Sequence, residues 1–168
     1  YFELNKLDLA AADYKKARQI KPDYATANDN LGALFGLRRR YDSALVYFNN
    51  ALAINPRYPN SYKNRALVYL ELNRMEESAA DFNNYLDLIT NDPDIMNMVG
   101  VCYRNLARYK EAVAIISQAI TIKPDPRFYL NRAYCYRGLK DFASARRDVV
   151  VARQGGLQID AELAKSLE

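Results

Sequence analysis

Apolar residues recur along this chain at the spacing of an amphipathic helix. Ala44, Phe48 and Leu52 follow one another at intervals of four residues. A second stripe with the same spacing precedes them, at Leu31 and Phe35. Apolar residues that recur at this period form one face of an amphipathic helix. The pattern therefore predicts two helices joined by a short turn.

The same pair of stripes returns every 34 residues. A shift of 34 places Pro22 on Pro56, and a shift of 68 places Leu31-Gly32 on Val99-Gly100. Internal repeats of this length are typical of solenoids built from helix pairs. We expect a single domain over 1–168, with helix A at positions 2–14 of each repeat and helix B at positions 18–31. The predicted segments are a partial repeat at 1–24, repeats at 25–58, 59–92, 93–125 and 126–159, and a capping helix at 160–168.

Helix ends are marked by several residues. Asp42 and Asp160 each directly precede a predicted helix, where a carboxylate accepts hydrogen bonds from free backbone N–H groups. Proline at position 32 ends helix B, because it lacks a backbone N–H. The segment 160–168 is amphipathic, and we expect it to cover the apolar face that the last repeat exposes.

Small residues at positions 8, 20 and 27, aromatic residues at 11 and 24, and a proline at 32 recur in phase. In these residues the chain resembles the tetratricopeptide repeat family from Tyr1 to about Ile159. The resemblance implies an all-α fold, a right-handed superhelical solenoid of antiparallel helix pairs. The third repeat departs from the pattern, because Tyr85 places a large ring at position 27 and Thr90 replaces the proline. We expect looser packing between the third and fourth repeats.

The resemblance also implies where a partner binds. In this family helix A of each repeat lines a concave groove, mainly through positions 2, 5, 6, 9, 12 and 13. The implied function is a protein-interaction scaffold that binds an extended peptide or a partner helix in that groove. The candidate peptide-binding residues are Asn30, Lys63, Asn64, Asn97, Met98, Arg104, Arg127, Asn131, Tyr134 and Arg137.

Asparagine occupies position 6 in three of the four whole repeats, as Asn30, Asn64 and Asn131. An amide both donates and accepts hydrogen bonds, so a row of amides can hold the main chain of an extended peptide. The row resembles the asparagine ladder in the repeat domain of O-linked N-acetylglucosamine transferase. Met98 interrupts it, one residue from Asn97. The chain holds fifteen asparagines, so the alternative that these amides are solvated or bonded to a neighbouring helix stays open.

Part of the predicted groove is positive, through Lys63, Arg104, Arg127 and Arg137. Charge complementarity therefore favours a partner segment with some acidic residues. Tyr134 at position 9 should face the groove and serve as an anchor. The family's clamp for the acidic tails of heat-shock chaperones is incomplete, because Asp94 and Met98 stand where it needs basic residues.

The chain has no histidine and two cysteines among 168 residues. Without histidine there is no Cys/His zinc site and no Ser-His-Asp triad. No other catalytic constellation is visible, so we expect no enzymatic activity, no cofactor and no metal. Cys102 and Cys135 both lie at position 10 of helix A, in adjacent repeats. Packed helices lie about 8–10 Å apart, which is too far for a disulfide, so both thiols should be free and buried.

The formal net charge is +4, but acidic residues are interspersed with basic ones. The one tight basic run, Arg38-Arg39-Arg40, falls in a predicted turn, so nucleic-acid binding is not expected. No apolar run reaches the ~18 residues of a membrane span, and no signal peptide opens the sequence. Free thiols slightly favour a reducing compartment such as the cytoplasm, although a longer parent protein can carry a signal or an anchor.

Two other functions fit the same sequence. The chain can be the substrate-recruiting segment of a larger enzyme, such as a glycosyltransferase, whose catalytic domain lies outside these residues. It can also self-associate through an exposed end face. Neither alternative requires a residue pattern different from the one described above.

Overall fold

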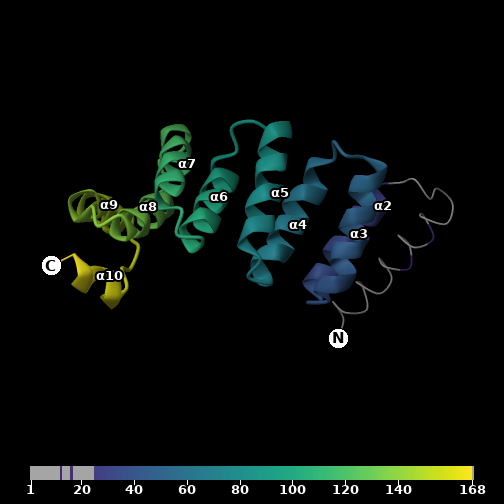
Figure 1. The fold of residues 1–168 in the computed structure, drawn as a ribbon, viewed down its shortest axis with the longest axis horizontal. Coiled ribbons are helices and arrows are strands. Elements are labelled where there is room, and N and C mark those ends of the chain that lie inside the picture. The colour runs from purple at the N-terminus through teal and green to yellow at the C-terminus, as the bar shows by residue number, and fades with distance from the viewer. Residues whose placement is uncertain (1–11, 13–15, 17–24, 168) are drawn as a thin grey trace. The chain divides into compact units, whose positions relative to one another are not determined.

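The computed structural model describes residues 12, 16 and 25–167, and this part of the chain contains helices and no strands (Figure 1). The all-α fold predicted from the sequence is therefore confirmed. The predicted partial repeat, 1–24, lies outside the described residues apart from 12 and 16. The helices are α2 (Ala25–Leu37), α3 (Tyr41–Ile54), α4 (Pro59–Glu71), α5 (Met75–Leu88), α6 (Pro93–Asn105), α7 (Tyr109–Ile122), α8 (Pro126–Gly138), α9 (Phe142–Gln154) and α10 (Ala161–Ser166).

Helices α2 to α9 form four antiparallel pairs, in which each even-numbered helix packs on the odd-numbered helix that follows it. Each helix A covers positions 1–13 of its predicted repeat, and each helix B begins at position 17. The helices thus start one residue earlier than the apolar stripes predict. In α4, α6 and α8 the extra residue is a proline at the first helical position, where a missing N–H costs nothing.

The four turns inside the pairs share one backbone geometry. Each contains a residue with a φ between 55° and 60°, and none of these residues is glycine: Arg39, Asn73, Ala107 and Lys140. The N–H of the next residue bonds the carbonyl five residues earlier, as Arg40 does with Phe35 at 2.9 Å. This arrangement satisfies the last carbonyls of helix A. The chain can then turn directly into helix B.

The same turn geometry corrects one of the two predicted N-caps. Helix α3 begins at Tyr41, so Asp42 lies inside its first turn and the residue before the helix is Arg40. The prediction that Asp42 caps this helix is therefore wrong. Asp160 does cap α10, because its carboxylate accepts a hydrogen bond from the N–H of Leu163 at 2.8 Å.

The chain divides into two compact units, Tyr1–Leu88 and Ile89–Glu168. The division falls between Tyr85 and Thr90, the two residues from which the sequence predicts looser packing. In the first unit, the core between α3 and α4 contains Ala44, Phe48 and Val68.

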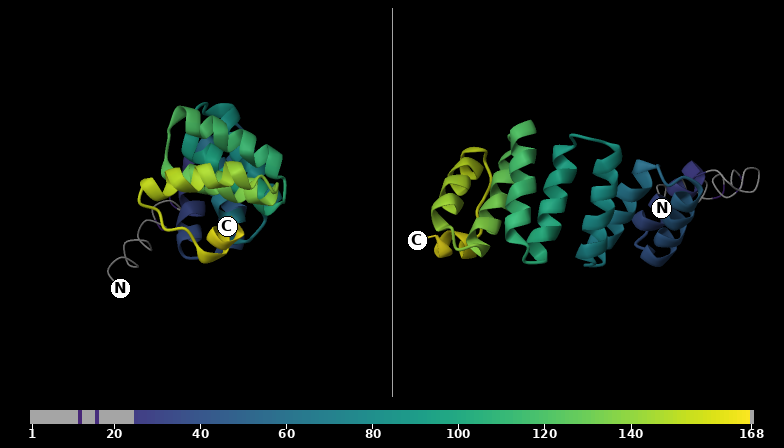
Figure 2. Two further views of the ribbon diagram at one scale, coloured as in Figure 1. Left: turned by 90° about the vertical axis from the view of Figure 1, so that its left-hand side faces the viewer. Right: turned by 45° about the horizontal axis from the view of Figure 1, so that its top comes forward.

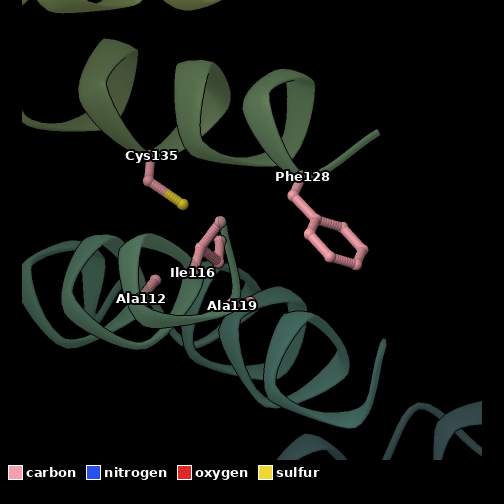
Figure 3. Packing of buried hydrophobic residues seen from close by; sticks show 5 residues of the cluster. All are labelled: Ala112, Ile116, Ala119, Phe128 and Cys135. Atoms are coloured by element: carbon pink, nitrogen blue, oxygen red, sulfur yellow. The ribbon is translucent and has the colours of Figure 1, made fainter. Parts of the chain in front are cut away.

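The second unit has two buried clusters. One joins α7 to α8 through Ala112, Ile116, Ala119, Phe128 and Cys135 (Figure 3). The other joins α8 and α9 to α10, which lies beside the last helix pair (Figure 2). Its members are Ala133, Ala145, Val149, Leu163 and Leu167. Leu163 is fully buried, so α10 covers apolar surface of the last pair.

Each unit also contains an arginine–aspartate pair that the apolar pattern does not reveal. Arg65 on α4 donates from Nε and Nη2 to Asp81 on α5 at 2.6 and 2.7 Å. Arg132 on α8 donates to Asp148 on α9 in the same way, with both bonds at 2.8 Å. A bidentate arginine–carboxylate pair fixes the geometry of both side chains. The second helix pair of each unit is therefore held by the same ionic contact.

Candidate functional site

Five of the predicted site residues come together in the second unit, on helices α6 and α8. Asn131 links them, because its Nδ2 donates to Oδ1 of Asn97 at 3.0 Å. Its Oδ1 accepts a hydrogen bond from Nη1 of Arg104 at 3.4 Å. The two helices thus hold a short polar chain that fixes the position of Arg104.

Two arginines lie close to the ring of Tyr134. The guanidinium carbons of Arg104 and Arg137 lie 5.1 and 5.6 Å from the centre of its ring. Asn131, Tyr134 and Arg137 are spaced by three residues, so they share one face of α8. Cation–π attraction stabilises this arrangement of the two positive charges on the ring. The result is a compact cationic and aromatic surface.

A pocket of about 540 Å³ opens over this surface. Its volume lies within the range of pockets that hold a small molecule or a few side chains. Gly138 shapes one wall, because a Cβ atom there would lie 2.6 Å from the ring of Tyr109. The absence of a side chain at Gly138 therefore lets α7 approach α8. The lining residues are Arg104, Tyr109, Asn131, Tyr134, Arg137 and Gly138.

Helix α10 brings two carboxylates to the rim of this pocket. The hydroxyl of Tyr134 donates a hydrogen bond to Asp160. Nη1 of Arg137 donates to Oε1 of Glu162 at 3.0 Å. Burial, together with the bond to Asp160, raises the pKa of Tyr134 to about 12. The same bond is the main cause that lowers the pKa of Asp160.

The first unit holds an equivalent polar link. Ser61 donates from Oγ to Oδ1 of Asp29 at 2.8 Å, and Nδ2 of Asn64 lies 3.3 Å from both carboxylate oxygens. Burial raises the pKa of Asp29, although the hydrogen bonds from Ser61 and Asn64 oppose that effect. Lys63 places its Nζ 5.6 Å from the ring centre of Tyr85.

The asparagines at position 6 therefore share a structural role in the two units. Asn64 donates to Asp29, and Asn131 donates to Asn97, which is the residue at position 5 of the preceding repeat in both cases. This is the bond to a neighbouring helix that the sequence left open. This bond occupies an amide N–H donor that a ladder would offer to a bound peptide. Binding of a peptide main chain by the remaining amide groups stays a prediction.

Besides Lys63 and Asn64, three further predicted site residues lie apart from the pocket. Asn30 is half-buried on α2, and Met98 is half-buried on α6. Arg127 lies at the start of α8, where its Nη2 is 2.6 Å from Asp125 and 3.3 Å from Asp94. The hydrogen bonds from Arg127 lower the pKa of Asp125 to about 2. Arg127 thus serves an ionic contact at a helix start.

Sequence reasoning missed several partners of the site. Tyr109 occupies the first position of α7 and was not expected to line a pocket. Asp160 was expected as an N-cap alone, and Glu162 carried no assignment. Two acidic residues, Asp160 and Glu162, stand at the start of the capping helix in the sequence, but no spacing there relates them to Tyr134 or Arg137.

Neither a cluster of metal-ligating side chains nor a membrane-spanning helix is found among the described residues. Among residues 12, 16 and 25–167, no three histidine, cysteine or acidic side chains are placed to hold a metal ion. Within the same residues, no helix combines the length and the apolar composition that crossing a bilayer requires. Cys102 and Cys135 are both buried and do not form a disulfide, as the sequence predicts.

Models of known protein families match most of the chain. Two models described as tetratricopeptide repeat match residues 31–98 and 93–126, and one described as TPR repeat matches residues 1–37. Together they span residues 1–126, which is more than half of the chain. The chain belongs to the tetratricopeptide repeat family. No curated protein matches it at the sequence level.

Solved structures of TPR proteins share this fold. YrrB, described as a TPR protein with an unusual peptide-binding site, is 21% identical with a TM-score of 0.84, over 97% of this chain and 84% of YrrB. MamA is 17% identical with a TM-score of 0.84, over 92% of this chain and 91% of MamA. PilF of Pseudomonas aeruginosa is 20% identical with a TM-score of 0.76, over 99% of this chain and 74% of PilF. At these identities the likeness concerns the fold alone.

TPR proteins are typically non-catalytic scaffolds that bind other proteins. The fold of this TPR chain accordingly supports a general role in protein interaction, with proteins or peptides as partners.

Proposed function

We propose that this TPR chain is a scaffold whose second unit binds an extended segment of a partner protein at the pocket over α6 and α8. The observation that carries the proposal is the joining of Arg104, Asn131, Tyr134 and Arg137 around one opening of about 540 Å³. These side chains combine directional hydrogen-bond donors with an aromatic ring. Arginine and tyrosine are the residues that most often dominate the energy of protein interfaces.

Asn131 and Arg104 have different parts in this proposal. Asn131 already bonds Asn97 and Arg104, so it positions the guanidinium. Arginine has five N–H donors, and the bond to Asn131 involves only Nη1 of Arg104. The remaining donors of Arg104 suit the carbonyl or carboxylate oxygens of a bound segment, while the ring of Tyr134 packs against its side chains.

YrrB is also a TPR protein, and it is described by its peptide-binding site. Its likeness to this chain does not transfer any residue or ligand. It supports the choice of a peptide segment as the first class of ligand to test.

A random peptide library displayed on phage provides that test. Peptides selected on the whole protein are measured against the wild type, Arg104→Ala and Arg153→Ala. Arg153 is an exposed arginine in the last turn of α9, so its substitution matches the loss of charge away from the pocket. We expect Arg104→Ala to weaken binding by about tenfold or more, as loss of a central arginine does, and Arg153→Ala to have little effect.

The proposal fails if the library yields no specific peptide, or if the selected peptides bind Arg104→Ala as tightly as the wild type. Circular dichroism of each variant checks that the helices remain folded.

A further inference from the structure

Helix α10 presents its own acidic residues to the pocket. Asp160 accepts a hydrogen bond from the hydroxyl of Tyr134, and Glu162 pairs with Arg137 at 3.0 Å. Both acceptors are carboxylates, and both donors belong to the residues that line the pocket. The pocket therefore already binds two carboxylates, supplied by the chain itself.

The position of α10 is set by packing that does not involve these carboxylates. Leu163 and Leu167 are buried against α8 and α9. Glu162 remains 85% exposed although it forms an ion pair. An exposed ion pair contributes little to stability, because water competes for both partners. Glu162 can therefore leave Arg137 while the apolar side of α10 stays in place.

The second arginine of the pocket has a different environment. Arg104 donates to the amide oxygen of Asn131 and stacks on Tyr134. Among the described residues, no carboxylate lies within ion-pair distance of Arg104, whereas Arg137 has Glu162. Arg104 thus has neutral neighbours, and Arg137 has an acidic neighbour that is exposed.

We propose that the ligand of this pocket is an acidic peptide segment, and that Asp160 and Glu162 of α10 are internal competitors for it. One carboxylate of the segment binds Arg104. A second replaces Glu162 on Arg137 or Asp160 on Tyr134. The inference rests on the proposed function, since it names the chemistry of the segment bound at the same site.

Electrostatics favours an acidic segment over a basic or a neutral one. A basic segment would place like charges beside Arg104 and Arg137, which opposes binding. A neutral segment would gain nothing from Arg104 beyond ordinary hydrogen bonds, and charged acceptors form the stronger bonds with arginine.

Two labelled peptides of about 12 residues serve as probes, long enough to bind as an extended segment. One carries glutamates in a Gly-Ser background, and the other carries glutamines at the same places. Fluorescence anisotropy measures their affinities for the whole protein. We expect the glutamate peptide to bind the wild type about tenfold more tightly, and Arg104→Gln to remove this preference.

Competition by α10 is tested with the double variant Asp160→Asn, Glu162→Gln. Asparagine caps a helix about as well as aspartate, so α10 should keep its place. We expect the affinity for the glutamate peptide to rise about fivefold, because two competing charges are removed.

The matched control is Asp141→Asn, Glu77→Gln, which changes net charge equally. Asp141 caps α9 through the N–H of Ser144, and Glu77 forms an exposed ion pair with Arg74. We expect this control to change the affinity by less than about twofold.

The outcomes separate the two proposals. If the phage-selected peptides require Arg104 but are not acidic, the proposed function stands and this inference is overturned. Unchanged affinity in the α10 double variant overturns the competition. Equal gains in the double variant and in its control also overturn it, because they would reflect net charge alone. If a single-stranded RNA binds more tightly than the glutamate peptide, the ligand class is wrong.

Discussion

The side chain of Ile116 lies directly against the backbone of Gly100, and a Cβ atom added there would come within 2.7 Å of Cδ1 of Ile116. Ile116 is fully buried between α7 and α8 (Figure 3), so it has no room to withdraw. We expect Gly100→Ala to lower the free energy of unfolding by about 1–3 kcal/mol, as overpacking does. Denaturant unfolding followed by circular dichroism measures the change.

Gly36→Ala is the matched control for this substitution. A Cβ atom at Gly36 would meet Cγ2 of Val68 at 3.6 Å, which is an ordinary contact. Alanine favours a helix over glycine by about 1 kcal/mol, so Gly36→Ala should stabilise the protein. If both substitutions had the same sign, close packing at Gly100 would not explain the result. Ile116→Ala combined with Gly100→Ala should cost less than the sum of the two single losses, because the shorter side chain leaves room for the added Cβ atom.

The ion pair between Arg132 on α8 and Asp148 on α9 is largely buried. The side chains of the pair are only 17% and 6% exposed. Asp148→Ala leaves the guanidinium without its partner, and we expect a loss of about 3 kcal/mol in the free energy of unfolding. Asp81→Ala should cost a similar amount, because Arg65 binds Asp81 in the same way.

Two further variants test whether that loss comes from leaving a charge without its partner. Replacing both Arg132 and Asp148 by leucine should cost less than Asp148→Ala alone, because no charge is then left without a partner. Glu77→Ala removes an exposed pair with Arg74, and the unfolding midpoint should hardly change. A larger loss in the double variant than in Asp148→Ala would contradict the ionic explanation.

Acid should release the polar contact between α8 and α10. The hydrogen bond from Tyr134 lowers the pKa of Asp160. A carboxyl whose folded pKa is lowered stabilises the fold above its unfolded pKa, and loses that effect as pH falls through the folded value. The loss should therefore begin below about pH 4. NMR shifts of Tyr134 and of the Leu163 amide follow it, and Asp160→Asn should remove the transition.

The hydrogen bond between Tyr134 and Asp160 should also be lost at high pH. The pKa of Tyr134 is raised to about 12, so its contribution is complete below the unfolded value of about 10 and is lost as pH rises through the folded value. Ultraviolet titration of tyrosinate, compared with Tyr134→Phe, should show one tyrosine that ionises late. A difference curve centred near pH 10 would contradict the hydrogen bond.

Both thiols should be slow to react in the folded protein. Burial raises the pKa of Cys135 to about 11, and Cys102 is fully buried. Since the thiolate is the reactive form, a thiol reagent near neutral pH should react at least about 100-fold faster after unfolding. Unfolding without a reducing agent should release two thiols. Rapid reaction of the native protein would show that the packing around these residues opens readily.

Position 8 shows what the sequence can and cannot predict. Recurring glycine, alanine and aromatic positions were enough to predict an all-α chain of helix pairs. A shift of 68 aligns Gly32 with Gly100, and the structure gives the reason. Gly32 lies against Phe48 as Gly100 lies against Ile116. The first helix pair of each unit thus uses a glycine contact, and the second uses an arginine–aspartate pair.

Turn geometry and polar contacts between helices could not be predicted from the sequence. The start of α3 was misplaced because Arg39, rather than a glycine, adopts the positive φ that closes the turn. Asn131 was identified as a site residue from its position, but its bonds to Asn97 and Arg104 depend on side-chain orientation across two helices. No periodicity encodes such orientations. The same holds for Glu162, whose role depends on where α10 docks.

The residues with positive φ in the turns inside the helix pairs are places where the protein can be stabilised by substitution. Arg39, Ala107 and Lys140 are exposed, non-glycine and left-handed, a conformation that costs such residues about 1–2 kcal/mol. None of them lines the pocket. Glycine at these places would relieve that penalty, less its own greater loss of freedom on folding. Heat resistance could then be increased without altering any side chain that meets a guest peptide.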